Sequence, residues 1–288
     1  MEATRVIVVM TVFNRRERTI ACLRALHASA SRMGGIAMSV CLTDDGGTDG
    51  TSEAVSAEFP DTRILRGSGA LFWSGGMRKA MAEAMTLHPD YYLWLNDDVL
   101  LVSDAIERMI QTAQAERQTR GREPIVVGST VDPTTGKATY GGRVRLHRFR
   151  PLQFSLVEPG AVPLHCETMN ANSVLLPADV VTHIGNLDPA FVHGLGDFDY
   201  GLRAARAGYD LLVCPGFVGQ CSGGTDRGDM PVSFRSLRMA WKSITGPKAL
   251  PPVAWRTFTQ RYAGPFWILY WLKPYANALF LGLLRGGI

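Results

Sequence analysis

Uninterrupted apolar runs mark the first strands of the chain. Arg5–Thr11 reads RVIVVMT, and Met38–Leu42 and Tyr91–Leu95 are similar runs. Strands that are buried on both faces have this pattern, because helices cover a parallel sheet on each side. Between the first two runs, apolar residues from Ile20 to Leu26 recur at helical spacing. This alternation predicts an α/β fold with a mostly parallel, Rossmann-like central sheet flanked by helices.

The same pattern extends the prediction through the rest of the chain. A helix is expected at Met77–Leu87, after a glycine-rich loop, and another with Ile106 and Met109 on its buried face. Lys137–His147 alternates as in an antiparallel hairpin, and residues 148–166 are loop-like, so a small antiparallel portion is expected on the acceptor side. Further strands are predicted at Arg63–Arg66, Ile125–Val131, Ser173–Leu176 and Leu211–Cys214, with a helix that begins at Pro177.

The run Tyr91–Leu95 stops at the sequence Asn-Asp-Asp of residues 96–98. In open α/β sheets, ligands bind at the carboxyl ends of the strands. Two adjacent carboxylates repel each other unless a cation offsets them, and oxygen ligands suit Mg²⁺ or Mn²⁺. The alternative is a solvated turn or the N-cap of the next helix. Ser103 or Asp104, followed by Glu107, is the better capping candidate, which favours the metal interpretation.

Two other strand ends also carry loops with candidate chemistry. Residues 43–51 (TDDGGTDGT) are turn-rich and acidic, and a helix is expected to open at Thr51 or Ser52. Asp44 and Asp45 can accept hydrogen bonds from ribose hydroxyls or a base N–H; the alternative is a tight turn between strand and helix. The glycines of residues 67–76 let a ligand approach the backbone, and the helix that follows could direct its amino end at phosphate.

A third group of acidic residues lies in the stretch Phe191–Arg203. Asp199 and Arg203 are four residues apart, so they can pair on one helix face. Asp197 falls near the start of that helix, where its charge is favoured and its side chain can face a cleft. The alternative is that Asp197 is simply the N-cap.

Composition indicates an ordered globular protein with a cationic tail. The 288 residues are 46% hydrophobic and 19% charged, enough for one large domain or two small ones. The net charge of +4 is unevenly placed, because no acidic residue follows Asp229. An anionic membrane surface or a phosphorylated lipid is the expected partner of the tail; there is no nucleic-acid recognition motif. The basic residues of the tail are Arg235, Arg238, Lys242, Lys248, Arg256, Arg261, Lys273 and Arg285.

The cysteines predict a reducing compartment. They are odd in number and lack paired spacing, so buried reduced thiols are expected and no zinc site is implied. A strand begins almost at the amino terminus, without a charged region and cleavage site, so the expected location is cytoplasmic. The five positions are Cys22, Cys41, Cys166, Cys214 and Cys221.

Residues 263–284 (AGPFWILYWLKPYANALFLGLL) are rich in aromatics and almost free of charge. Pro265, Lys273 and Pro274 interrupt the run, which leaves no segment of ~20 apolar residues to span a membrane. A helix that lies in the membrane interface or docks on the acceptor cleft fits this pattern. A helix packed on the core or in a homodimer interface fits it equally well.

Five segments stand in the order that a known family shows: TVFNR (11–15), DDGGTDGT (44–51), FWSGGM (72–77), LNDDV (95–99) and GLGDFDYGLRAARAGY (194–209). They resemble the family 2 glycosyltransferases with the GT-A fold, closest to the rhamnosyltransferase-like bacterial members. The resemblance implies a GT-A domain at residues 1–230, with a donor half at 1–131 and an acceptor and catalytic half at 132–230. Residues 231–288 would then form a basic, aromatic helical extension.

The resemblance implies that a sugar moves, with inversion, from a nucleotide-sugar to a hydroxyl acceptor. A UDP- or dTDP-sugar donor and a glycan or lipid-linked acceptor are expected, in cell-surface polysaccharide synthesis at the inner face of the cell membrane. Asp98 matches the ligand of Mg²⁺ or Mn²⁺, and Asp197 matches the general base. The residues that match the donor site are Thr11, Phe13, Asn14, Arg15, Asp44, Asp45, Trp73, Gly75, Gly76, Asn96 and Asp97.

Two positions depart from the family pattern. Gly196 stands where many relatives have Glu, and residues 219–222 (GQCS) stand where some have a metal-binding His. The metal would then rely on Asp98, the diphosphate and water, with His193 as a distant candidate. A nucleotidyltransferase and a non-catalytic nucleotide-sugar-binding protein are the rival classes. The former would favour a Gly-rich, basic loop after the first strand, which residues 12–15 (VFNR) lack.

Overall fold

The apolar runs lie next to one another in the central sheet. The computed structural model describes residues 3–147, 149–223 and 237–285. In these ranges the main sheet has ten strands; β5 (Leu100–Leu101) pairs with β13 and β7 (Ala138–Tyr140) pairs with β6. The other eight follow the order β10 (Leu164–Cys166), β13 (Leu211–Gln220), β6 (Ile125–Val131), β12 (Ser173–Pro177), β4 (Tyr91–Leu95), β1 (Thr4–Val12), β2 (Ile36–Asp44) and β3 (Arg63–Arg66).

The strand pairing confirms the predicted, mostly parallel sheet. β1 pairs in parallel with β2 and with β4, and β2 pairs in parallel with β3. β12 is antiparallel to both β4 and β6, while β13 runs parallel to β6. Because β1 lies between β2 and β4, the loops that follow these three strands emerge beside one another.

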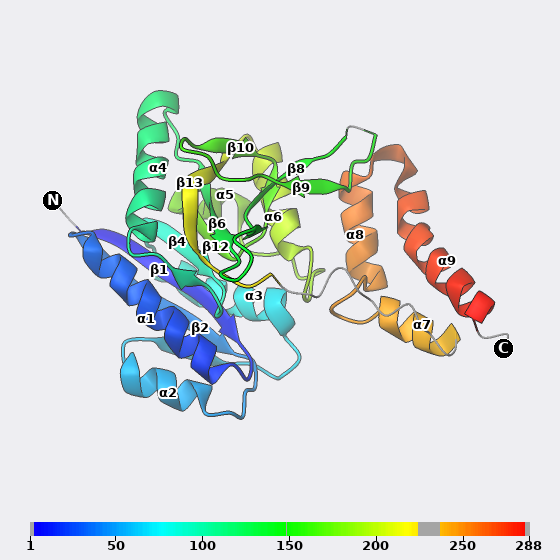
Figure 1. The fold of residues 1–288 in the computed structure, drawn as a ribbon, viewed down its shortest axis with the longest axis horizontal. Coiled ribbons are helices and arrows are strands. Elements are labelled where there is room, and N and C mark those ends of the chain that lie inside the picture. Colours follow the sequence, from blue (N-terminus) through cyan, green and yellow to red (C-terminus); the bar gives the residue numbers. More distant parts are fainter. Residues whose placement is uncertain (1–2, 148, 224–236, 286–288) are drawn as a thin grey trace.

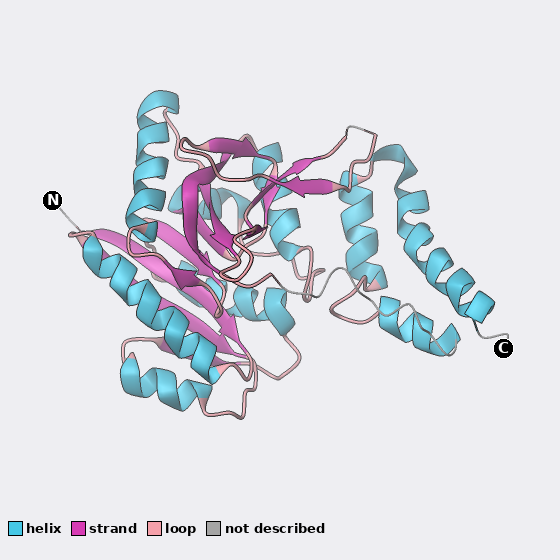
Figure 2. Cartoon of the chain, viewed as in Figure 1, coloured by secondary structure: helices cyan, strands magenta, loops and turns pink. Residues whose placement is uncertain are grey.

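Helices cover both faces of the sheet, as Figures 1 and 2 show. Along β1, Val6, Val8 and Met10 face one layer, and Ile7 and Val9 face the other. This alternation explains why the strand is apolar at every position. The first layer is α1 (Arg16–Arg32), α2 (Thr51–Glu58) and α4 (Ala105–Arg120), and the second is α3 (Phe72–Met85), α5 (Ala178–Ile184) and α6 (Gly196–Arg206).

A second, three-stranded antiparallel sheet consists of β8 (Gly142–Arg145), β9 (Phe154–Leu156) and β11 (Thr168–Met169). The segment Lys137–His147, predicted as antiparallel, contains two strands: β7 is antiparallel to β6 in the main sheet, and β8 is antiparallel to β9 and β11 in this one. The chain passes between the sheets at Gly142, where an added Cβ would lie 2.4 Å from Val213 Cγ2. Residues 148–166, predicted as loop, also contain the short strands β9 and β10.

The chain ends in three helices on the side of the molecule away from the amino terminus (Figure 1). They are α7 (Leu237–Ile244), α8 (Pro252–Tyr262) and α9 (Trp267–Arg285), with a 3₁₀ turn at Gly264–Phe266 before α9. Phe258 and Tyr262 of α8 pack against Phe191 and Phe198 in a separate apolar cluster. Helix α8 therefore docks on α6, whose first turn contains Asp197.

Helix α9 continues through Pro274, one of the residues that interrupt the apolar run. Proline has no backbone N–H, so the carbonyl of Tyr270, four residues earlier, loses its helical partner. The indole N–H of Trp255 donates to that carbonyl at 3.2 Å. Trp255 thus replaces the missing hydrogen bond. None of the helices in the described ranges is both long enough and apolar enough to cross a membrane.

Candidate active site

The loops after β1, β2 and β4 meet at one edge of the main sheet. Asn14, in the left-handed region with φ of 52°, accepts a hydrogen bond through Oδ1 from the N–H of Thr48 at 2.7 Å. This bond ties the first loop to the second. Phe13 lies in the first loop with 52% of its surface exposed. The two loops are thus joined at the edge of the sheet where the sequence predicts the donor.

Arg15 bridges the two carboxylates that follow β4. Its Nη1 lies 3.1 Å from Asp97 Oδ1 and 3.0 Å from Asp98 Oδ2. The Asp97 side chain is only 8% exposed and the Asp98 side chain is 25% exposed. Burial raises the pKa of Asp97 to about 6, and the neighbouring charge of Asp98 raises it further while Arg15 acts in the opposite direction. One guanidinium thus faces two carboxylates, so Arg15 offsets only part of their negative charge.

The carboxylates fit a divalent ion, because they already hold a positive charge between them and supply oxygen donors. Among the described residues, no three His, Cys, Asp or Glu side chains are grouped so that they could hold a metal. Asp98, the more exposed of the two, would therefore hold the ion together with oxygens of a bound diphosphate and water. When bound, such an ion offsets negative charge on a leaving diphosphate.

Asp44 is held by its own loop and its neighbours. One carboxylate oxygen accepts from the Gly47 N–H at 2.8 Å, and the other accepts from the Ser52 hydroxyl and lies 3.5 Å from Arg66 Nη1. The residue is 1% exposed. The predicted tight turn is present, and Asp44 fixes its shape.

Asp45 orders the glycine-rich segment. Its carboxylate accepts backbone N–H bonds from Gly69 at 2.9 Å, Leu71 at 2.9 Å and Phe72 at 3.0 Å. Carboxylates at a helix start satisfy unpaired N–H groups and interact favourably with the helix dipole. As a result α3 begins at Phe72, five residues before the predicted start at Met77.

The early start places Trp73, Gly75 and Gly76 inside the first turns of α3. The indole N–H of Trp73 donates to Asn96 Oδ1 at 2.8 Å, which joins the helix to the loop after β4. Gly76 packs on Thr11 so closely that an added Cβ would lie 2.0 Å from the threonine Oγ1. The two glycines are buried. The absence of a side chain at Gly76 lets α3 pack closely on β1.

Asp197 lies in the first turn of α6, and Leu195 rather than Asp197 is the N-cap residue. One carboxylate oxygen accepts from the Phe198 N–H at 2.9 Å, and the other accepts from the Ala171 N–H at 3.4 Å. The carbonyl of the next residue, Asn172, accepts from the Asn96 N–H at 3.0 Å. Asp197 and the Asn-Asp-Asp loop are therefore held on either side of one two-residue segment.

Helix α3 also contacts the segment before α6. The Ser74 hydroxyl donates to the carbonyl of His193 at 2.9 Å, and its N–H donates to the carbonyl of Val192 at 3.0 Å. The His193 ring packs edge-on against Phe72. A Cβ added at Gly196 would lie 2.6 Å from Ser74 Oγ. This contact is the physical reason why a side chain such as Glu does not fit at position 196.

Sequence reasoning did not find the thiol, just after the end of β13, that contacts Asp98. Cys221, next to the end of that strand, places its thiol 3.6 Å from Asp98 Oδ1 and 3.9 Å from Asn172 Nδ2. Burial, and then the charge of Asp98, raise the pKa of Cys221 to about 12, so the thiol is neutral. The signal was available, because the segment 219–222 is the one that departs from the family pattern. All five cysteines are buried free thiols, as predicted.

A buried ion cluster ties α6 to the C-terminal helices. The predicted pair is present, with Arg203 Nε 2.8 Å from Asp199 Oδ2. Arg261 of α8 adds a second cation, 2.7 Å from Asp199 Oδ1, and also binds Asp188 Oδ2 at 2.6 Å. The Tyr262 hydroxyl donates to Asp199 at 2.8 Å. Asp199 thus anchors the helix that carries Asp197.

The mostly parallel sheet with helices on both faces, the small antiparallel sheet and the acidic loop after β4 are features of GT-A glycosyltransferases. The model of glycosyl transferase family 2 matches residues 7–158, more than half of the chain, and the protein belongs to this family. Membership implies transfer of a glycosyl group from a nucleotide-sugar, in a family that typically uses a divalent metal. The match includes Asp98 and ends before Asp197. A comparison with curated proteins finds no match.

Proposed function

We propose that the protein is an inverting glycosyltransferase that moves a hexosyl or deoxyhexosyl group from a nucleotide-diphosphate-sugar to a hydroxyl acceptor. One observation carries the proposal. Asp197 and the Asn-Asp-Asp loop are hydrogen bonded to adjacent residues, Ala171 and Asn172. In an inverting transfer the acceptor hydroxyl attacks in one step, from the side opposite the departing diphosphate. This step needs a carboxylate that lies close to the diphosphate-binding edge of the sheet but is not part of it.

Asp197 would act as the general base in this reaction. Its carboxylate would take the proton of the acceptor hydroxyl as that oxygen attacks the anomeric carbon, while the bond to the diphosphate breaks. Its two backbone N–H contacts keep it oriented. General-base action of this kind contributes about 10²–10⁴-fold to a rate.

The donor would bind at the ends of β1, β2 and β4. We assign the base and ribose to the loops that Asp44 and Asp45 organise, with Thr11, Phe13, Asn14, Trp73, Gly75 and Gly76 around them. Asp98 would hold Mg²⁺ or Mn²⁺ with Asn96 and Asp97 beside it. Arg15 contacts both carboxylates, so it can turn toward the diphosphate when a metal takes its place.

The domain organisation and the setting follow from the same assignment. We infer a transferase domain at residues 1–230, with donor and acceptor halves that divide at residue 131, and an extension at 231–288. The five segments quoted above favour the rhamnosyltransferase-like subgroup, a UDP- or dTDP-sugar donor and a polysaccharide or lipid-linked acceptor. The free thiols suit the cytoplasm. Exposed Leu269 and Phe280 of α9, with Phe266 in the turn before it, would let this segment rest on the membrane or on a second copy.

Release of diphosphate from a panel of UDP- and dTDP-sugars, with Mn²⁺ or Mg²⁺, tests the function. Asp197→Asn should lower turnover by about 10²–10⁴-fold and leave the thermal shift produced by the nucleoside diphosphate unchanged. Asp98→Ala should lose both turnover and the metal-dependent thermal shift. Asp61→Asn, an exposed carboxylate in the turn before β3, is the matched control and should behave as wild type.

Unchanged turnover in Asp197→Asn would remove the assigned base. A nucleoside diphosphate that binds while no donor is ever cleaved would instead indicate a nucleotide-sugar-binding protein. Formation of nucleotide-sugar from a nucleoside triphosphate and a sugar phosphate would indicate a nucleotidyltransferase.

A further inference from the structure

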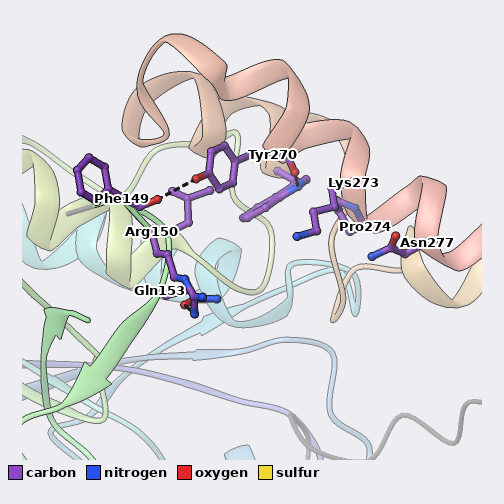
Figure 3. Close-up of a pocket in the computed structure, with 9 residues that line it drawn as sticks. Phe149, Arg150, Gln153, Tyr270, Lys273, Pro274 and Asn277 are labelled. Carbon is purple, nitrogen blue, oxygen red and sulfur yellow. Dashed lines mark hydrogen bonds between the residues drawn. The ribbon is translucent and has the colours of Figure 1, made fainter. Parts of the chain in front are cut away.

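A cavity of about 720 Å³ lies between the β8–β9 connection and the C-terminal helices. Figure 3 shows Phe149, Arg150 and Gln153 on one side, and Tyr270, Lys273 and Asn277 on the other. The Tyr270 hydroxyl donates to the Phe149 carbonyl at 3.4 Å and joins the two sides. The volume is in the usual range for ligand pockets. It is not lined by any of the donor-site residues assigned above.

The charged groups of this cavity are all cationic. None of its nine lining residues is acidic, and two of them are Arg150 and Lys273. Arg150 Nη1 donates to Gln153 Oε1 at 3.4 Å. In the part of the chain that the structure describes, neither cation is paired with a carboxylate. Two unneutralised cations in one cavity favour a ligand with negative charge.

The remaining lining suits a sugar. Trp255 and Tyr270 contribute aromatic rings, against which the apolar C–H face of a pyranose ring can be buried. The amides of Gln153 and Asn277 supply both donors and acceptors for hydroxyl groups. Aromatic faces, amides and unpaired cations together match a sugar that bears an acidic group.

Two lining residues connect the cavity to the apolar cluster that includes Phe198 of α6. Leu152 and Trp255 line the cavity and also pack against the cluster that contains Phe198. Phe198 follows Asp197 directly and lies edge-on to Phe154, with ring centroids 5.4 Å apart. A ligand in the cavity would therefore lie on the acceptor side of α6.

We propose that this cavity binds an anionic glycan, as part of the acceptor that is presented to the active site. Arg150 and Lys273 would bind its phosphate or carboxylate, and Trp255 and Tyr270 would hold the adjacent sugar ring. The identification of this ligand as the acceptor rests on the proposed transferase function; the binding of an anionic glycan does not. A lipid-linked sugar phosphate and an acidic sugar of a polymer share this chemistry.

Calorimetric titration of the full chain with four probes tests the proposal. Glucose 1-phosphate carries the phosphate, a hyaluronan tetrasaccharide carries carboxylates, chitotetraose is neutral, and inorganic phosphate lacks a sugar. One or both anionic sugars should bind more tightly, by about tenfold or more, than chitotetraose, which lacks the charge, and than inorganic phosphate, which lacks the ring. The reason is that a charge-assisted bond and a buried ring face each add to affinity. The anionic sugar that binds better distinguishes phosphate from carboxylate acceptors.

Matched variants place the binding in the cavity. Lys273→Met should weaken the affinity for the anionic sugar by about tenfold or more. Lys248→Met removes an exposed cation elsewhere in the extension and should change that affinity by less than about twofold. Tyr270→Leu should weaken the affinity for the anionic sugar and leave the affinity for inorganic phosphate unchanged. Equal affinities in Lys273→Met and Lys248→Met, or no binding of either anionic sugar to wild type, would overturn the proposal.

Two further measurements distinguish this proposal from the transferase assignment and from binding to a membrane surface. The thermal shift produced by the nucleoside diphosphate should be the same in Lys273→Met and wild type. If wild type shows no such shift but the cavity results hold, the transferase assignment fails and the anionic-glycan site stands. Binding to phosphatidylglycerol vesicles that Lys273→Met abolishes, without binding of any sugar probe, would overturn the glycan assignment in favour of a membrane surface.

Discussion

Replacing Arg261 by Met should lower the free energy of unfolding by about 3 kcal/mol. The Asp199 side chain is fully buried, and Arg261 Nη1 lies 2.7 Å from it. Removal of one partner of a buried pair costs about 3–5 kcal/mol. Asp199 keeps Arg203 and the Tyr262 hydroxyl, both at 2.8 Å, so the loss should lie at the lower end of that range. The partly exposed pair with Asp188 adds about 0–1 kcal/mol.

The loss should not depend on pH between 6 and 9. Burial opposes the charge of Arg261, but the hydrogen bonds and charges of Asp188 and Asp199 outweigh it and raise the pKa of Arg261 above its ordinary value. The guanidinium therefore stays charged throughout this interval, and the interaction that the variant removes stays the same.

Urea unfolding followed by circular dichroism measures the effect, with Arg256→Met as a control. Arg256 is exposed on the same helix, and its loss should change stability by less than about 0.5 kcal/mol. At ~2–4 °C per kcal/mol, Arg261→Met should melt about 6–12 °C below wild type. A double-mutant cycle with Asp199→Asn should give a coupling of about 1–3 kcal/mol. Additive effects, or an Arg261→Met as stable as Arg256→Met, would refute the reasoning.

Two further predictions concern Asp97 and Gly76. Because the pKa of Asp97 is raised from 3.8 to about 6, the folded state binds its proton more tightly than the unfolded state, so this group reduces stability as pH rises from about 4 to 6. The melting temperature of Asp97→Asn relative to wild type should therefore be higher at pH 7.5 than at pH 4.5, by the equivalent of up to about 3 kcal/mol; an equal difference at both pH values would contradict this. Gly76→Ala should cost at least about 1–3 kcal/mol in urea unfolding, because its Cβ would overlap Thr11 Oγ1, whereas Gly34→Ala has open space. If both glycine variants are equally stable, the close packing of α3 on β1 is not as described.

The sequence alone predicted the elements whose boundaries depend on their own residues. Tyr91–Leu95 and Ile125–Val131 were predicted with their observed limits, since an apolar run is visible in the strand itself. The pair of Asp199 with Arg203 was predicted for the same reason, because helical spacing alone brings the two together.

Features that depend on distant residues could not be predicted. Helix α3 starts early because Asp45, more than twenty residues upstream, binds its first N–H groups. Pro274 is tolerated because Trp255 bonds to the carbonyl that it leaves unpaired. Arg261 joins Asp199 only because α8 folds back on α6. No local pattern encodes contacts of this kind.

The contact between Gly196 and Ser74 means that the side chain at one of these positions restricts the choice at the other. Even a methyl group at 196 would meet the serine Oγ at 2.6 Å, and the hydroxyl cannot turn away without giving up its bond to the His193 carbonyl. A related sequence with an acidic residue at 196 must therefore differ at 74 or in the path of the chain through 192–193. Among such sequences, the residue on α3 would predict the residue that precedes Asp197, and a side chain introduced at 196 with Ser74 unchanged would push the two helices apart.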